Sequence, residues 1–342
     1  MSAALNLSVV GASDFPTLLG VNRYESPTEL WNRIVHGIGR QTPLWLDEAG
    51  ELGTAHELGT AESLVRLRLG REPRLGKPPS RVRPAGEAWL RYSLDFVQGV
   101  DFEAEDFEIV PHEREAPALI ECKYRGDRSF AAQGWGEDGS AGVPLDVYCQ
   151  VQVQMAAAWL DRDWWCGTSV PELPETHVAV VAWPRLYHYT VPRDIAVGEA
   201  LLERGRKWWR DYVETEVAPP LDGSEGASRF LASKHPSAVG KVREGTEEEG
   251  ALVESYRRAR ERVEEAKKDL HRCQQLLESA IGDDRGISGE GYKITWANQR
   301  GAVDWRSVAE SLAHRLELSD VEIRECSDFH RREPFRRFNA RL

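Results

Sequence analysis

Apolar residues recur at a regular spacing between positions 252 and 280, and this pattern constrains the fold of the chain more than any other. From Leu252 to Ala280 the spacing alternates between four and three residues over four heptads, with mostly Glu, Arg, Lys and Gln between. The pattern predicts one long helix with a narrow apolar seam, ended by Gly282. Such a seam packs within its own chain, against another copy, or against another protein. Its alanines favour close antiparallel packing within one chain.

The residues before position 220 follow another pattern, in which strand-like and helix-like segments alternate. We expect strands at 89–97, 107–110, 118–124, 178–183 and 186–191, and helices at 54–69, 145–160 and 194–217. This alternation predicts an α/β fold of the mixed α+β kind, with helices layered on a sheet.

Three domains are expected along the chain. Residues 1–220 form the core, and 221–250 form a linker-like segment rich in Gly, Ser and Glu. Residues 251–342 form a helical extension with a short strand at 292–296, a short helix at 305–316, and a C-terminal tail rich in Arg and Phe. The tail is expected to contact nucleic acid.

The composition excludes several classes of protein. Of 342 residues, 41% are hydrophobic and 29% charged, which is ordinary usage for a globular protein. The five cysteines are scattered without a CxxC pair, so neither a disulfide framework nor a zinc ribbon is indicated. No apolar run reaches membrane-spanning length, and the N-terminus has no basic region, so we expect a cytoplasmic protein without membrane association.

The formal net charge of −12 argues against a protein that coats nucleic acid without specificity. It leaves open a DNA enzyme whose basic residues are concentrated in a channel.

Two carboxylates and a lysine are expected at one edge of the sheet. Asp95 lies at the end of a predicted strand, and Glu121 and Lys123, two residues apart, leave the same face of another. With the backbone carbonyl of Cys122, the carboxylates suit Mg²⁺ or Mn²⁺, and the lysine suits an attacking water. Glu-x-Lys on a strand is more often a solvated ion pair, and Asp101 or Asp106 are alternatives to Asp95.

Three further positions carry candidate polar groups. On the predicted helix 145–160, Gln150 and Gln154 share a face while Gln152 points elsewhere, and a neutral amide is a suitable donor to phosphate. Glu57 is expected in the first turn of its helix, where a carboxylate is favoured by the helix dipole. Ser13 is expected to cap a helix N-terminus and, secondarily, to bind phosphate.

Taken in order, five segments form a family pattern. They are GASDFPTLLGVNRYESPTELW, GTAHELG, WLRYSLDF, LIECKYR and YCQVQVQMAAAW. Together they resemble the YqaJ-like viral recombinase family, relatives of lambda exonuclease within the PD-(D/E)XK nuclease superfamily. The resemblance covers about residues 8 to 220. It implies a restriction-endonuclease-like central sheet flanked by helices, and a Mg²⁺-dependent exonuclease acting on linear double-stranded DNA from the 5′ end in phage-type homologous recombination.

The resemblance also implies roles for individual residues. Asp95 and Glu121 match the metal-binding carboxylates, and Lys123 matches the catalytic lysine. Gln150 corresponds to a glutamine beside the phosphate, and Glu57 to a helix glutamate near the metals. Ser13 and Ser93 occupy the places of serines near the DNA 5′-phosphate.

The chain departs from the family pattern in three places. About 25 residues separate Asp95 from Glu121, more than in the compact family form. The family's Ser-Pro-Asp-Gly is here Ser93-Leu94-Asp95-Phe96, and no basic residue precedes Ser13 where an arginine is expected. Arg23, Arg125 or Arg128 are candidates to replace that arginine.

The implied partners are linear duplex DNA and a single-strand annealing protein, and the implied assembly is a homo-oligomeric ring, often a trimer, in a bacterial or phage-infected cell. One alternative is a Cas4-like or structure-specific nuclease, although the cysteines lack the spacing that an iron-sulfur cluster needs. The other is a non-catalytic DNA-end-binding scaffold that uses the heptad helix and the basic tail.

Overall fold

The fold is that of a computed structural model, which describes residues 9–22, 24–38, 44–78, 80–102, 109–111, 118–161, 175–237, 240, 242–297 and 304–329. The chain divides into two compact units, Met1–Lys234 and His235–Leu342. Within the described ranges, no helix is both long enough and apolar enough to cross a membrane.

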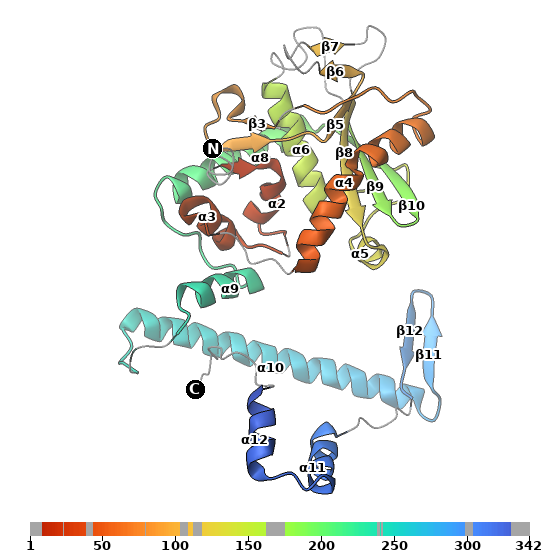
Figure 1. The fold of residues 1–342 in the computed structure, drawn as a ribbon. Coiled ribbons are helices and arrows are strands. Elements are labelled where there is room, and N and C mark those ends of the chain that lie inside the picture. The colour runs from red at the N-terminus through yellow and green to blue at the C-terminus, as the bar shows by residue number, and fades with distance from the viewer. Residues whose placement is uncertain are drawn as a thin grey trace. The chain divides into compact units, whose positions relative to one another are not determined.

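A five-stranded mixed sheet is the centre of the first unit (Figure 1). Its order is β10-β9-β8-β5-β2, with bounds Arg185–Pro192, Glu175–Ala182, Ala118–Arg125, Phe96–Gln98 and Leu75–Gly76. Strands β8 and β9 are parallel, and the other neighbours are antiparallel. The mixed α/β fold expected from the sequence is therefore confirmed.

Helices cover both faces of this sheet (Figure 1). On one face α4 (Leu44–Leu67) buries Ala61, Leu64 and Val65 against Ile120 and other sheet residues. On the other face α6 (Leu145–Leu160) is buried along most of its length, and α8 (Ile195–Trp208) packs on it. The small helices η1 (Ala12–Asp14) and α2 (Phe15–Leu18) also contact α6.

The remaining elements of the first unit lie around this core. They are β1 (Val10–Gly11), α3 (Pro27–His36), β3 (Arg81–Val82), η2 (Pro84–Gly86), β4 (Leu90–Tyr92), β6 (Val100–Phe102), β7 (Ile109–Pro111), α5 (Asp127–Ala132), the π-helical turn η4 (Trp209–Val213) and α9 (Glu225–Lys234).

The strand expected at 89–97 is two strands in different sheets. Strand β4 pairs with β1 and β3, whereas β5 pairs with β8 and β2. Between them the chain passes from one sheet to the other, with Leu94 buried. The aromatic and β-branched composition is common to both strands, so composition does not reveal the break. Of the strand expected at 107–110, positions 107 and 108 lie outside the described residues.

Three helix boundaries differ from expectation. Helix α4 begins at Leu44 rather than near Thr54, and it includes Gly50 and Gly53, because glycine inside a helix costs only about 1 kcal/mol. Helix α8 passes into the π-helical turn instead of continuing to Val217. The segment expected to be a linker contains α9, which packs on α3 through an ion pair between Arg229 and Glu29.

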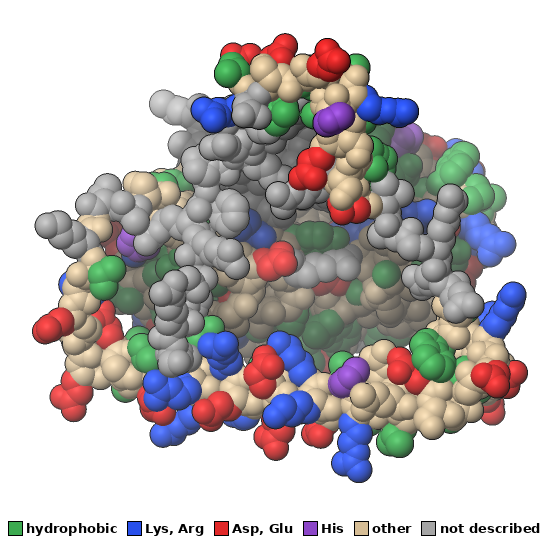
Figure 2. Space-filling view, turned by 90° about the horizontal axis from the view of Figure 1, so that it is seen from below, with side chains coloured by type: hydrophobic (Ala, Val, Ile, Leu, Met, Phe, Trp, Pro, Cys, Tyr) green, Lys and Arg blue, Asp and Glu red, His purple; other side chains and the backbone are tan. Residues whose placement is uncertain are grey.

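The second unit is dominated by α10 (Glu247–Ile281), the long helix that the heptad pattern predicts. A reciprocal capping box of Thr246 and Glu249 begins it. A hairpin of β11 (Gly286–Gly289) and β12 (Tyr292–Thr295) follows, then α11 (Trp305–Arg315). Helix α12 (Asp320–Phe329) was not expected, and the basic tail lies outside the described residues. Acidic and basic side chains are interspersed on the face in Figure 2.

Candidate active site

Asp95 lies against the strand that carries Glu121 and Lys123. It directly precedes β5, whose first residue Phe96 pairs with Ile120 of β8. The backbone N–H of Cys122 donates a hydrogen bond of 2.8 Å to Asp95 Oδ2. Sheet register therefore brings together carboxylates that are 26 positions apart in the sequence.

Glu121 is 3% exposed and accepts hydrogen bonds on both carboxylate oxygens. Oε1 accepts from Lys123 Nζ and, at 2.7 Å, from Gln150 Nε2. Oε2 accepts from Gln154 Nε2, also at 2.7 Å. Gln150 Oε1 in turn accepts from Lys123 Nζ at 2.9 Å, which closes a ring of three side chains.

The two glutamines come from one face of α6, in successive turns, as the helical spacing predicts. Gln152 points away from the site, where it bonds the carbonyl of Pro192 and the backbone N–H of Asp194. The apparent alternation of Gln with Cys and Val is thus a helix with both faces buried. One face is buried against apolar residues and the other against the carboxylates.

The site holds more negative than positive charge. Burial and then the charge of Glu121 raise the pKa of Asp95 from 3.8 to about 7, although the Cys122 N–H and Lys123 oppose that rise. Two carboxylates against one close ammonium favour a bound cation, and hard oxygen donors match Mg²⁺ or Mn²⁺. Among the described residues, no three His, Cys, Asp or Glu side chains gather at metal-binding distance. The other ligand positions would therefore fall to a carbonyl, water or substrate.

Cys122 and Glu57 belong to the opposite side of β8, beside α4. The Cys122 thiol donates to the Glu57 carbonyl at 3.5 Å, and burial, then the charge of Asp95, raises its thiol pKa. The Glu57 carboxylate forms a 2.8 Å ion pair with Lys77. Because α4 begins ten residues earlier than expected, Glu57 lies in mid-helix, and the first-turn prediction is wrong. Glu57 and Lys123 both line a cavity of about 190 Å³.

A second cavity, of about 180 Å³, adjoins the carboxylates on the side of α6. It is lined by Gly11, Ala12, Ser13, Arg91, Ser93, Asp95, Gln150 and Gln154. The structure thus brings Ser13 and Ser93 together beside Asp95. Ser13 lies inside η1, whose N-cap is Gly11, so the expectation that Ser13 caps a helix is wrong.

Arg91 is the residue of this cavity that the sequence analysis missed. It lies on β4, two residues before Ser93, and lines the cavity together with Ser13 and Ser93. A Cβ on Gly11 would lie 3.3 Å from Arg91 Nη2 and 3.5 Å from Ser13 Oγ, so the glycine lets these groups lie over the backbone. The sequence did offer a signal for Arg91: it is two residues from Ser93, and side chains at that spacing on a strand point to the same face.

The other candidates lie apart from this cavity. Arg125 lines the cavity beside Glu57 and bonds Gln133 at 3.2 Å. Arg128 is exposed on α5 and lines neither cavity. Asp101 lies on β6, paired with β7, whereas Arg23 and Asp106 lie outside the described residues.

Comparisons with known proteins give structural matches only. No family model matches the chain, and no curated protein matches it. An alkaline exonuclease from Laribacter hongkongensis, solved alone and in complex with dAMP, matches with TM-scores of 0.40 and 0.41. Identity is 15%, and the match covers 68% of this chain and 97% of that one.

The shutoff and exonuclease protein of Kaposi's sarcoma-associated herpesvirus matches with a TM-score of 0.36 and 9% identity, covering 66% of this chain and 70% of that one. The chain is thus similar to solved exonucleases at low identity.

Proposed function

We propose that this chain is a metal-dependent deoxyribonuclease, an exonuclease that hydrolyses phosphodiester bonds of linear double-stranded DNA from the 5′ end. One observation carries the proposal. Three separate segments converge: Gln150 of α6 forms a hydrogen-bonded ring with Glu121 and Lys123 of β8, and Asp95, just before β5, accepts from the backbone N–H of Cys122 between them. A solvated surface pair, the ordinary interpretation of Glu-x-Lys, does not bury its carboxylate to 3% exposure.

Asp95, Glu121 and the carbonyl of Cys122 would hold Mg²⁺ or Mn²⁺. When bound, such an ion lowers the pKa of a water molecule and offsets the charge that develops on the phosphate. The described contacts use two of the three N–H bonds of Lys123, to Glu121 and Gln150. The third is free to orient the attacking water, and the two contacts fix its direction.

The cavity beside Asp95 suits a terminal phosphate. Arg91 supplies a guanidinium, and Ser13 and Ser93 supply hydroxyl donors. A 5′-phosphate bound there would lie next to the carboxylates, so cleavage would occur close to a DNA end. This geometry supports an exonuclease over an enzyme that cuts within a strand.

The assembly and its partners are part of the same proposal. A homo-oligomeric ring, such as a trimer, concentrates basic groups around DNA and accommodates a net charge of −12. A single-strand annealing protein would take up the strand that digestion exposes, in phage-type homologous recombination.

End-labelled linear duplexes with and without a 5′-phosphate test the proposal when they are incubated in Mg²⁺ or in EDTA. We expect short products from the 5′ end in Mg²⁺ and none in EDTA. Glu121→Gln and Lys123→Ala should each abolish cleavage, while Lys207→Ala, which removes an exposed ion pair with Asp211, should not. Full activity of either site variant would refute the assignment. Binding of DNA ends without metal-dependent cleavage would favour the scaffold alternative.

A further inference from the structure

Helix α10 carries an apolar seam that the rest of the described chain leaves exposed. Leu252, Tyr256, Val263, Leu270 and Leu277 are exposed by 70, 42, 51, 70 and 37%. Of the residues of α10, Ile281 alone is buried within the described part of the chain. An apolar stripe of this length that is exposed to solvent indicates a site of contact with another protein.

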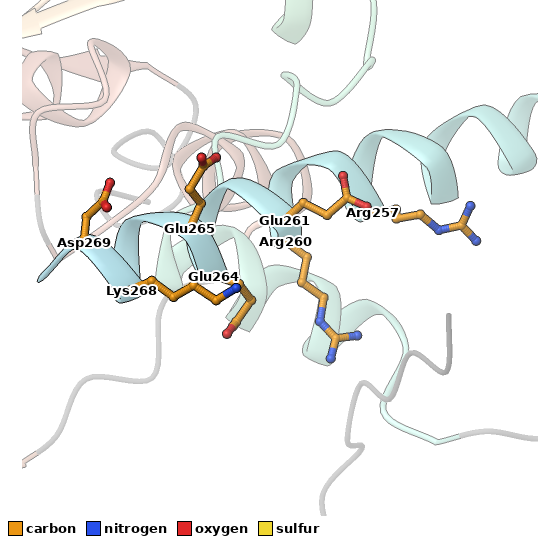
Figure 3. Close-up of a pocket in the computed structure, with 7 residues that line it drawn as sticks. All are labelled: Arg257, Arg260, Glu261, Glu264, Glu265, Lys268 and Asp269. Atoms are coloured by element: carbon orange, nitrogen blue, oxygen red, sulfur yellow. The ribbon is translucent and has the colours of Figure 1, made fainter. Parts of the chain in front are cut away.

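The other faces of α10 are polar. Figure 3 shows seven charged side chains that line a hollow along the middle of the helix. They are Arg257, Arg260, Glu261, Glu264, Glu265, Lys268 and Asp269, and none is a seam residue. The helix is therefore amphipathic along its length, with one narrow stripe for a partner.

The size of the seam residues alternates along the helix. The larger residues Tyr256, Val263, Leu270 and Leu277 occupy heptad position a, and Ala259, Ala266, Cys273 and Ala280 occupy position d. In a parallel pair, position a faces a and d faces d, so layers of two large residues alternate with layers of two small ones. In an antiparallel pair, a faces d, and every layer holds one of each.

A second copy of the chain matches the seam in one antiparallel register. Val263 then faces the partner's Ala266, Ala259 faces the partner's Leu270, and Tyr256 faces the partner's Cys273. Leu252 and the partner's Leu277 close each end of the interface. Large residues fill the space left by small ones in the three inner kinds of layer, as close packing requires, and a pair of leucines covers each end.

The charges beside the seam select the same orientation. In the antiparallel register, Arg262 faces the partner's Asp269 twice, by symmetry. In a parallel pair, Arg262 faces the partner's Lys267 on both sides, which is repulsive. On the other edge of the antiparallel pair Arg260 meets the partner's Lys267, which is also repulsive. Glu264 pairs with Lys267 of its own helix at 2.9 Å in either orientation, so the attractive Arg262–Asp269 contacts, which the parallel pair lacks, make the difference.

We propose that two copies of this chain associate through α10 as an antiparallel coiled coil centred between Val263 and Ala266. The occupant of the seam is thus a second copy of the chain. The dimer is separate from the proposed nuclease activity and from any ring formed by the first unit. The experiments that test it measure cross-linking and the mass of the assembly, and they do not depend on cleavage of DNA.

Cross-linking of the full chain tests the register, because Cys273 is exposed and free. In a background with Cys166→Ser and Cys326→Ser, Tyr256→Cys places a thiol opposite the partner's Cys273. Oxidised glutathione, which is reduced as the two thiols join, should yield a dimer on a non-reducing gel. Adding Cys273→Ser should remove that dimer. Lys268→Cys in the same background, on the charged face, should give none.

The background protein, without Tyr256→Cys, also distinguishes an antiparallel from a parallel pair. In the antiparallel register the two copies of Cys273 are 17 residues apart along the coil, about 25 Å at 1.5 Å per residue, and cannot join. A dimer formed by the background protein would indicate a parallel pair and overturn the proposal. Absence of a dimer with Tyr256→Cys would overturn it as well.

Sedimentation equilibrium of the unmodified full chain gives an independent result. We expect an even multiple of the monomer mass, which Leu270→Glu should halve and Lys268→Glu should leave unchanged. A monomer would mean that the chain covers its own seam. A trimer unaffected by Leu270→Glu would mean that assembly uses another surface. Either result would refute the dimer.

Discussion

Gln154 donates a 2.7 Å hydrogen bond to Oε2 of Glu121, and both side chains are buried. The same amide nitrogen also donates to the carbonyl of Ser93 at 2.9 Å. Gln154 thus connects the strand that carries Glu121 with the segment that carries Asp95. Although Gln154 lines the cavity beside Asp95, its amide nitrogen makes these two bonds, so we treat it as a positioning residue for Glu121.

Replacing Gln154 with Leu should lower cleavage by roughly 10- to 100-fold, the usual cost of losing a group that orients a metal ligand. The physical reason is that Glu121 Oε2 keeps no donor from α6 and becomes free to rotate. A Mg²⁺ titration of activity should show a weaker apparent affinity. Gln152→Leu is the matched control. It removes a buried amide that bonds Pro192 and Asp194, so it should lower the melting temperature without shifting the Mg²⁺ dependence.

Binding of Mg²⁺ should strengthen as pH rises from 6 to 8. The pKa of Asp95 is raised from 3.8 to about 7 by burial and then by the charge of Glu121, so the carboxyl must lose a proton before it can hold a cation. Isothermal titration calorimetry at several pH values, in buffers of different ionisation enthalpy, should detect proton release on binding. Affinity that is constant over this range would contradict the assignment of Asp95 as a ligand.

The same carboxyl should destabilise the metal-free protein at neutral pH. Because its pKa is raised in the folded state, the folded protein holds more protons than the unfolded chain between about pH 4 and 7, and stability falls as pH rises through that window. Asp95→Asn should therefore raise the melting temperature at pH 8 in EDTA, and raise it less at pH 5. An equal rise in melting temperature at pH 5 and pH 8 would show that ionisation of Asp95 does not cause the destabilisation.

Arg91→Ala should reduce the preference for DNA with a 5′-phosphate over DNA with a 5′-hydroxyl. The guanidinium lies in the cavity with Ser13 and Ser93, and a charge-assisted bond to phosphate is worth about 1.5–3 kcal/mol, roughly 10- to 150-fold in relative rate. The measurement is the ratio of cleavage rates on the two substrates. Arg91→Lys should retain part of the preference, and Arg128→Ala, on α5 outside the cavity, should retain all of it.

Local patterns predicted the elements of this fold well where a segment is long and regular. Helix α6 has the bounds expected from Pro144 and the residues that follow, and α10 follows the heptad pattern. Patterns failed where two short elements share one composition, as at the break between β4 and β5. They also failed at the start of α4, which includes two glycines that disfavour a helix only weakly.

The sequence by itself determined which chemical groups are available and which of them share a face. Glu121 and Lys123 alternate with Cys122 on one strand, and Gln150 and Gln154 lie one turn apart on one helix, because strand and helix periods are local properties. Tertiary structure alone decided that these groups meet. The pairing of β5 with β8 brings Asp95 to Glu121, and the packing of α6 on the sheet closes the hydrogen-bonded ring. Tertiary structure likewise places Arg91 in one cavity with Ser13 and Ser93. Contacts between distant segments depend on register and packing, which no single segment encodes.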